Sequence, residues 1–292
     1  MEKYWFDPAG YESLYNCSMY STEKWHSFGY PNKFVGAFYT FIGIIYEILY
    51  FPCLYTMSSP KFLRFSCYKI MFFLGIIDMA CISINSIMAG YFAWHGNVFC
   101  DYPKIMYISG SISVGLWCTA CMSCMILACN RCCDILMPEW MEYLFQGWKA
   151  YLWLFAPSIY GLYFVFFTPP VIFTSIYDGA FFDPFVGMPV SDKERYTSWP
   201  HTMNNVTVII VLCIAYTSIC VFVCKKSQTI NGHTTSGLSS FNALQKSLIA
   251  QATLICTLIL SAATVYVLMQ FIELSGYMVI VGQISWQSSH GK

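Results

Sequence analysis

The chain has 292 residues, and its composition excludes an ordinary soluble protein. Apolar residues make up 57% of it and charged residues only 10%, whereas a typical soluble domain carries about 25% charged residues. Fifteen basic residues balance fifteen acidic ones, so the chain lacks the basic surface that binds nucleic acid. These values predict an integral membrane protein whose surroundings are the lipid bilayer.

Long stretches with few or no charges predict the membrane-crossing segments. A crossing needs roughly 20 apolar residues in a helix, and a helix satisfies its own backbone hydrogen bonds in lipid. We therefore expect an all-α bundle of seven transmembrane helices in residues 34–290, preceded by an N-terminal segment, residues 1–33. The expected spans lie near 34–57, 67–92, 104–129, 150–168, 205–224, 247–271 and 276–290.

The positions of lysine and arginine predict the orientation. The chain begins without the apolar run of a signal peptide, so the first span is expected to direct insertion. Basic residues favour cytoplasmic loops, and a modest excess falls on the loops that lie inside when the N-terminus is outside. We therefore expect a multi-pass protein of the plasma membrane with an extracellular N-terminus. The inner basic residues are then Lys61, Arg64, Lys69, Arg131, Lys149, Lys225, Lys226 and Lys246.

The fifteen cysteines predict one disulfide at most. Most of them fall inside spans, where cysteine acts as a small apolar residue, or on the reducing cytoplasmic side. Cys17 and Cys100 are the two on the oxidising side, and we expect them to pair; two free thiols are the alternative. Asn16-Cys17-Ser18 also fits the acceptor pattern for N-glycosylation, so Asn16 is a candidate glycan site.

Catalytic and metal-binding patterns are missing from the sequence. Cys118-Thr119-Ala120-Cys121 has the spacing of a zinc knuckle, but a zinc site needs four convergent ligands and no second knuckle or histidine accompanies it. No phosphate-binding loop, zinc-protease motif or Ser-His-Asp order is present either. We expect no metal, no cofactor and no enzymatic activity.

Two acids inside the expected spans are candidates for function, because ionisable residues in a membrane are costly. Asp78 lies mid-span, where a carboxylate can bind a cation, move a proton or anchor a water network. The alternative is a structural hydrogen-bond hub with Asn85, two helical turns further on. Glu47 in the first span is open to two interpretations: an acid neutralised by a polar partner, or a protonated buried acid.

The third span offers candidates for a ligand cavity. Arg131 follows an uncharged stretch, and the helix dipole and the lipid headgroups suffice to explain a cation there. Stepping back from it by the helical period gives a stripe of small, polar and aromatic residues, which indicates a helix face that points into the bundle. That stripe is Cys124, Trp117, Ser113, Gly110 and Met106. The residues that would line a cavity are Tyr107, Gly110, Ser113 and Trp117, with core packing as the alternative.

Two loops differ in character. Residues 168–204 are aromatic and acidic, which indicates a structured outer lid. Residues 225–246 are rich in Ser, Thr, Asn and Gly between flanking lysines, which is typical of a solvated inner loop.

Several strings, taken together, resemble those of the nematode serpentine receptors of class T. The resemblance covers nearly the whole chain. The strings are Tyr15-Asn16-Cys17-Ser18, Cys67-Tyr68-Lys69-Ile70-Met71, Leu74-Gly75-Ile76-Ile77-Asp78, Phe99-Cys100-Asp101-Tyr102-Pro103, Asn130-Arg131-Cys132 and Gly282-Gln283-Ile284-Ser285-Trp286-Gln287-Ser288-Ser289-His290-Gly291.

The resemblance implies a G-protein-coupled-receptor-like chemoreceptor. Such a receptor binds an extracellular small molecule, rearranges its helices and acts on a heterotrimeric G protein, and the resemblance places it in a sensory membrane such as the cilium. Asn130-Arg131-Cys132 would stand where rhodopsin-like receptors carry Asp-Arg-Tyr, and Asp78 would match the acid of a sodium and water pocket. Asp78, Asn85, Asn130 and Arg131 are thus the expected polar switch.

The sequence also departs from common receptor patterns. The loop after span four lacks the usual cysteine, span six lacks a Cys-Trp-x-Pro string, and we expect a truncated seventh span of about half the usual length. Three alternatives follow: a ligand-gated channel of the odorant-receptor type with its N-terminus inside, an ion-coupled transporter that uses Asp78 and Glu47, and a non-signalling truncated isoform.

Overall fold

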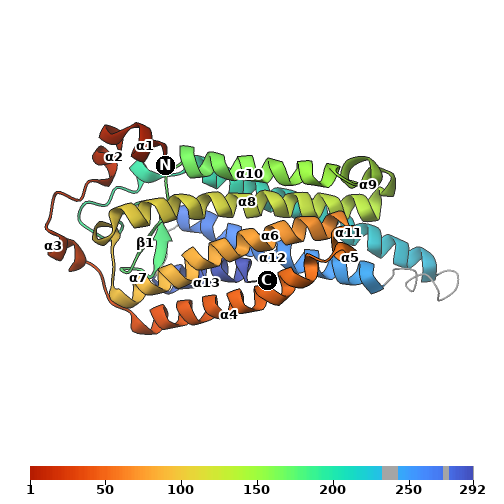
Figure 1. Cartoon of the computed structure of the whole chain (residues 1–292), viewed down its shortest axis with the longest axis horizontal. Coiled ribbons are helices and arrows are strands. Elements are labelled where there is room, and N and C mark those ends of the chain that lie inside the picture. Colours follow the sequence, from red (N-terminus) through yellow and green to blue (C-terminus); the bar gives the residue numbers. More distant parts are fainter. Residues whose placement is uncertain (232–242, 272–275, 292) are drawn as a thin grey trace.

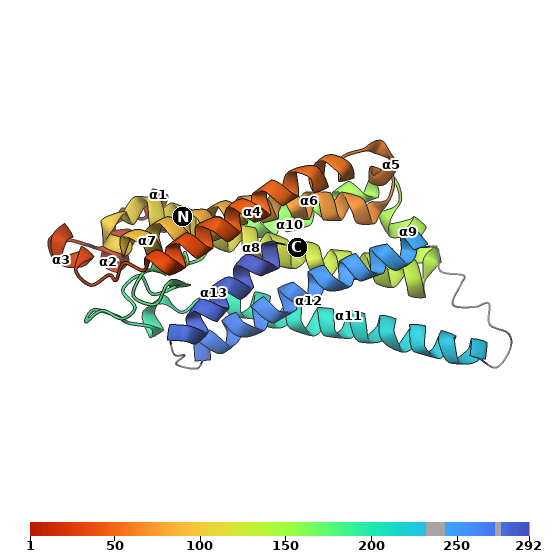
Figure 2. The same ribbon diagram turned by 90° about the horizontal axis from the view of Figure 1, so that it is seen from below.

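A computed structural model of the chain describes residues 1–231, 243–271 and 276–291. In these ranges seven long helical segments lie alongside one another (Figures 1 and 2). The segments are α4 (Lys33–Met57), α6 (Ser66–Ile82) continued by η1 (Ser83–Met88) and α7 (Ala89–His95), α8 (Pro103–Leu136), α10 (Lys149–Phe167), α11 (Trp199–Asn231), α12 (Ala243–Phe271) and α13 (Gly276–His290).

Five of these segments are long and apolar enough to cross a membrane. They are α4, the continuous stretch Ser66–His95, α8, α10 and residues Trp199–Ile219 of α11. In α12 the described apolar stretch is shorter, Cys256–Leu268, and α13 has 15 residues. Each expected span coincides with one helical segment, but α8 ends at Leu136 rather than near 129, and α11 begins at Trp199 rather than near 205. The middle of the expected inner loop 225–246 lies outside the described residues.

Helix α8 is the centre of the bundle. It packs against α6, α10, α11 and α12, and 72% of its most apolar stretch is buried, compared with 22% for α10. Small residues allow the closest approach: a Cβ on Gly161 of α10 would lie 1.9 Å from Thr119 Oγ1 and 2.8 Å from the Gly115 carbonyl of α8. Backbone approach through small residues stabilises helix pairs in membranes, where the hydrophobic effect does not drive association.

A π turn interrupts the second span. Residues Ser83–Met88 form η1 between α6 and α7. Such turns disturb the regular helical hydrogen-bond ladder and often occur at functional sites. The turn carries Asn85, which becomes important below.

One end of the bundle, called here the lid end, carries the non-membrane elements. The loop 168–198, called the lid, contains an antiparallel hairpin that pairs Ile172 with Phe181 and Thr174 with Gly179. The opposite end carries α5 (Pro60–Leu63) and α9 (Pro138–Phe145) (Figure 1). The elements of the lid end are α1 (Glu2–Phe6), α2 (Pro8–Tyr15), α3 (Thr22–His26), η2 (Phe99–Asp101), β1 (Ile172–Thr174), β2 (Gly179–Phe181) and η3 (Glu194–Tyr196).

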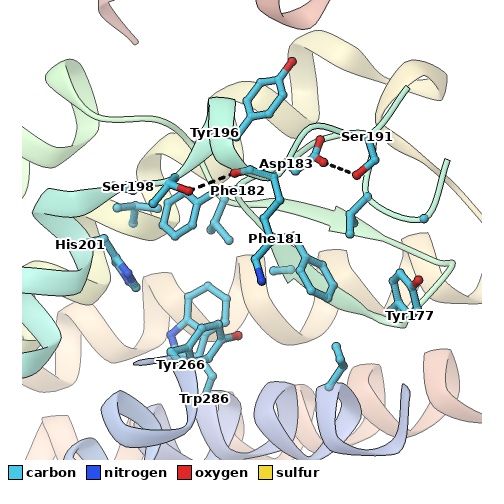
Figure 3. A pocket seen from close by; sticks show the side chains of 18 of the residues that line it. Tyr177, Phe181, Phe182, Asp183, Ser191, Tyr196, Ser198, His201, Tyr266 and Trp286 are labelled. Atoms are coloured by element: carbon cyan, nitrogen blue, oxygen red, sulfur yellow. Dashed lines mark hydrogen bonds between the residues drawn. The ribbon is translucent and has the colours of Figure 1, made fainter. Parts of the chain in front are cut away.

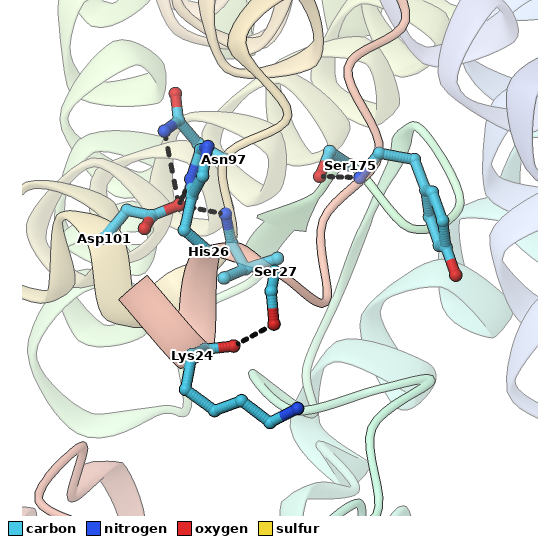
Figure 4. A network of polar contacts seen from close by, with 8 residues as sticks. Lys24, His26, Ser27, Asn97, Asp101 and Ser175 are labelled. Atoms are coloured by element: carbon cyan, nitrogen blue, oxygen red, sulfur yellow. Dashed lines mark hydrogen bonds and ion pairs between the residues drawn. The ribbon is translucent and has the colours of Figure 1, made fainter. Parts of the chain in front are cut away.

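Covalent and polar contacts hold the N-terminal segment on the lid end. Cys17 and Cys100 form a disulfide, with their Cα atoms 5.6 Å apart, which joins the two cysteines that the sequence singled out. Nearby, Asp101 Oδ2 lies 3.1 Å from His26 Nδ1 and accepts a bond from Asn97 Nδ2 at 3.2 Å (Figure 4). The N-terminal segment is therefore fixed to the start of α8.

The hairpin is fastened to α4 through its turn. Asp178 adopts a positive φ of 51° in that turn. Its Oδ2 accepts a bond from Asn32 Nδ2 at 2.6 Å, and its carbonyl accepts one from the Tyr39 hydroxyl at 3.0 Å. Burial raises the pKa of the Asp178 carboxyl from its ordinary 3.8 to about 6, although the bond from Asn32 acts in the opposite direction.

Candidate functional site

A cavity of about 450 Å³ lies beneath the lid. Its walls come from α8, the lid, α11, α12 and α13, so it lies among the third, fifth, sixth and seventh spans. Ligand pockets commonly have about 300–1,000 Å³ and mostly apolar walls with a few polar groups. This cavity has that size and composition.

Aromatic side chains form the floor of the cavity. The Trp286 ring lies 5.2 Å from Tyr266 and 6.2 Å from Trp117, in edge-to-face arrangements. Across from this floor, Phe182 contacts His201 with ring centroids 5.0 Å apart. Figure 3 shows Tyr266 and Trp286 projecting from α12 and α13 toward the hairpin that carries Phe181. The cavity can therefore hold an apolar or aromatic molecule between lid and helices.

Polar residues of the lid complete the lining. Asp183 accepts bonds from the Ser191 hydroxyl at 2.6 Å and from the backbone N–H of Phe185 at 2.9 Å, which fold the lid around its carboxylate. Burial raises the pKa of Tyr196 to about 12, and Asp183 acts in the same direction. The Tyr196 hydroxyl thus stays neutral and donates to the Leu14 carbonyl of the N-terminal segment.

A second, smaller cavity of about 30 Å³ lies next to the first. It is lined by Gly110 and Ser113 of α8, Asn85 of η1 and Gln283 of α13, and it shares Trp286 with the large cavity. One side chain of α13 therefore contacts both the candidate ligand space and the polar interior of the bundle.

That polar interior joins α13 to the π turn. The carbonyl of Asn85 accepts bonds from Gln283 Nε2 and Gln287 Nε2, each at 3.0 Å. The Asn85 side-chain oxygen accepts a bond from the Ser113 hydroxyl of α8 at 2.6 Å. Three helical segments thus meet at one asparagine, in the interrupted part of the second span.

A buried acid extends the network toward the middle of the bundle. Asp78 lies 2.7 Å from His290 Nδ1 through one oxygen and accepts a bond from the Tyr50 hydroxyl at 2.9 Å through the other. The Tyr50 hydroxyl also lies 2.7 Å from the His290 carbonyl. His290 and Asp78 are both fully buried. The polar string at the end of the seventh span therefore packs inside the bundle, and it supplies the partner of the buried acid.

Arg131 lies inside α8, which continues to Leu136. Its side chain is buried. Its guanidinium pairs with Asp134 at 3.1 Å and also donates to the Asn130 side chain. Asn130 in turn donates to Ser66 of α6 at 2.9 Å. These contacts join α8 to α6 at the end opposite the lid.

The four residues proposed to line one ligand cavity lie in three different places. Trp117 lines the large cavity, whereas Ser113 and Gly110 line the small one. A Cβ on Gly110 would lie 2.1 Å from the Val171 carbonyl, so this glycine admits the lid backbone. Tyr107 packs against the N-terminal segment, with its ring 4.9 Å from that of Tyr15. The helical period places these residues on the bundle side but does not show which element covers each one.

The four residues proposed as one polar switch form two clusters. Asp78 and Asn85 both contact α13, through His290 and the two glutamines, while Asn130 and Arg131 contact each other near the opposite end. Asp78 and Asn85 therefore share α13 as a partner helix.

The remaining predicted sites are placed as follows. Asn16 is exposed and accepts a bond from the Ser18 N–H at 2.7 Å. Glu47 accepts a bond from the Ser83 hydroxyl at 3.0 Å. No group of three metal-ligating side chains occurs within the described parts of the chain.

The sequence pattern of the family described as "Serpentine type 7TM GPCR chemoreceptor Srt" matches residues 4–292. The chain belongs to this family. Serpentine receptor class T-55 of Caenorhabditis elegans is 26% identical to this chain over 280 residues, which cover 95% of this chain and 74% of the relative. The resemblance inferred from the strings is confirmed, and so is the seven-helix membrane bundle. This member of the Srt family is thus a multi-pass, GPCR-like chemoreceptor.

Proposed function

We propose that this Srt receptor binds an extracellular small molecule in the large cavity and signals through helix rearrangement to a heterotrimeric G protein. The observation that carries the proposal is the place of Trp286. It lines both the cavity under the lid and the smaller space beside Asn85. Trp286 belongs to α13, and other side chains of α13 contact Asn85 and Asp78 of the second span. A molecule that contacts Trp286 therefore acts on the helix that makes these contacts.

The coupling requires two arrangements of the bundle. A ligand shifts an equilibrium only through its different affinities for the two arrangements. In the described arrangement Gln283 and Gln287 of α13 donate hydrogen bonds to the Asn85 carbonyl. A ligand that displaces the Trp286 ring changes the position of α13 and so the free energy of these hydrogen bonds. The helix rearrangement proposed here passes from α13 to α6 and α8, and so to Arg131.

The orientation is part of the proposal. With the N-terminus outside, the lid and its cavity face the exterior, the disulfide lies in an oxidising compartment, and Arg131 faces the cytoplasm. Asn16 is exposed beside this disulfide, and a glycan on it would report that the N-terminus lies outside. We expect the full chain, but not an Asn16→Gln variant, to lose mass on glycosidase treatment and to stain at the cell surface. A cytoplasmic N-terminal epitope would instead favour the channel interpretation.

A cavity-filling variant tests the site itself. Val186 lines the cavity from the lid, so a Val186→Trp side chain occupies ligand space. In cells that carry a G-protein reporter, we expect responses of the wild-type receptor to a small-molecule panel to be lost in Val186→Trp at equal surface level. Ile214→Trp, on an exposed face of α11, is the matched control and should respond normally. Unchanged responses in Val186→Trp would refute this binding site.

A further inference from the structure

The cavity lining contains buried hydrogen-bond donors without acceptors. Trp286 Nε1 and Ser198 Oγ find no partner among the residues that the structure describes, and both side chains are more than nine-tenths buried. An indole N–H only donates. Because a buried polar group without a partner is unfavourable, an acceptor oxygen that reaches either atom from the cavity would be stabilised there.

The charges of the lining favour the same chemistry. Two side chains of fixed charge line the cavity, Asp183 and Lys193. The Asp183 carboxylate already accepts bonds from Ser191 and from the backbone N–H groups of Phe185 and Asp192. Lys193 is exposed, and within the described parts of the chain no ion pair holds its ammonium. The oxygens of Asp183 are thus engaged by its own loop, whereas the Lys193 ammonium is the charged group of the lining that can contact a ligand.

We infer that the ligand is a small carboxylic acid with an apolar or aromatic body. Its charge is balanced by Lys193, its oxygens accept hydrogen bonds from Ser198 and Trp286, and its body lies against the rings of Trp117 and Tyr266. This inference rests on the proposed function and specifies its ligand class.

An amine is the main rival, because aromatic rings also bind cations. A cation in this cavity would face the Lys193 ammonium, and the one carboxylate of the lining is already satisfied by its own loop. The indole N–H of Trp286 would also stay without an acceptor. Lys193 therefore repels an amine and attracts an acid, and the oxygens of Asp183 that an amine would need are already occupied by donors of the lid.

Two matched series of compounds test the ligand class on the purified full chain. The first is octanoate, octanol and octylamine, and the second is indole-3-acetate, indole-3-ethanol and indole-3-ethylamine. Within each series the body is constant and the head group changes. Measured by the shift of the unfolding temperature with concentration at neutral pH, the acids should bind about tenfold more tightly than the alcohols, and the amines least tightly.

Variants assign this preference to Lys193. We expect Lys193→Gln to remove the advantage of the acids while binding of the alcohols persists, and Lys193→Arg to retain it. Lys104 is an exposed lysine at the start of α8 that does not line the cavity, so Lys104→Gln should behave like the wild type. Ser198→Ala should weaken acid binding without changing the unfolding temperature of the free receptor by more than the control does.

The outcomes separate the two proposals. Alcohols or amines that match the acids, or an acid preference that survives Lys193→Gln, would overturn the carboxylate inference. If such binding is still lost in Val186→Trp, the cavity remains the binding site and the proposed function stands. If none of the six compounds binds, the carboxylate inference is also contradicted. The proposed function is tested separately, by the response of the G-protein reporter in cells.

Discussion

At the scale of single residues, the buried acid Asp78 shows what a sequence can and cannot predict. A charge in the middle of an apolar span needs a partner, so its importance is visible from the sequence. The partner is not, because His290 lies 212 positions away in a polar string that looks like a solvated helix end. The clue available was that a buried acid demands a polar partner, and His290 carries an imidazole near the end of the seventh span.

The lining residues Lys193 and Ser198 escaped prediction for a different reason. They lie in a loop without helical or strand periodicity, so the spacing of residues does not predict which of its side chains point toward the bundle. Trp117 could be identified because it lies on a helix whose period points it inward.

Asp178 makes a pH-dependent prediction at this scale. Its pKa is about 6 in the folded chain and 3.8 ordinarily, so ionising it costs more in the folded state. Its contribution to stability therefore falls as the pH rises from about 4 to about 6. Asp178→Asn should raise the unfolding temperature at pH 7 and leave it nearly unchanged at pH 4.5. A variant effect independent of pH, or larger at pH 4.5, would contradict this account.

At the scale of elements, each stretch with few or no charges falls on one long helical segment. Helices α8 and α11 extend beyond the expected spans, and in α8 the extension buries the polar residues Asn130 and Arg131, which neighbours bind. The π turn and the short helices of the N-terminal segment were not predicted. The carbonyl of Asn85 in the turn accepts bonds from two side chains of α13, which no local pattern reveals, whereas the structured lid was indicated by its aromatic composition.

The contact between α8 and α10 provides a test at this scale. A side chain on Gly161 would collide with Thr119 and with the Gly115 carbonyl. We expect Gly161→Leu to force the helices apart, to lose about 1–3 kcal/mol of stability and to lower the unfolding temperature in detergent. A Cβ on Gly276 meets nothing within 4 Å, so Gly276→Ala is the matched control. Equal unfolding temperatures for the two variants would show that α8 and α10 do not pack this closely.

At the scale of the whole molecule, a cavity and two polar clusters follow one another along the bundle. The lid closes one end over a cavity, Trp286 adjoins both that cavity and the Asn85 network, and Arg131 lies buried toward the opposite end. Membership in the Srt family gives the receptor class, and the geometry specifies where a ligand would act on it. Family membership was visible in the strings, and a cavity among the third, fifth, sixth and seventh spans could be expected from it. The loop residues that close this cavity could not, because the loop meets four helices that are far apart in sequence.

Photoaffinity labelling tests the central claim, binding beneath the lid, most directly. The probes are octanoate and octanol that each carry a diazirine, irradiated with the full receptor and mapped by mass spectrometry. We predict labels on lid residues 177–198 and on α13 near Trp286, with little label in Val186→Trp. Labels confined to the exposed faces of α4 and α10, or to the end that carries α9, and equal in Val186→Trp, would contradict the account.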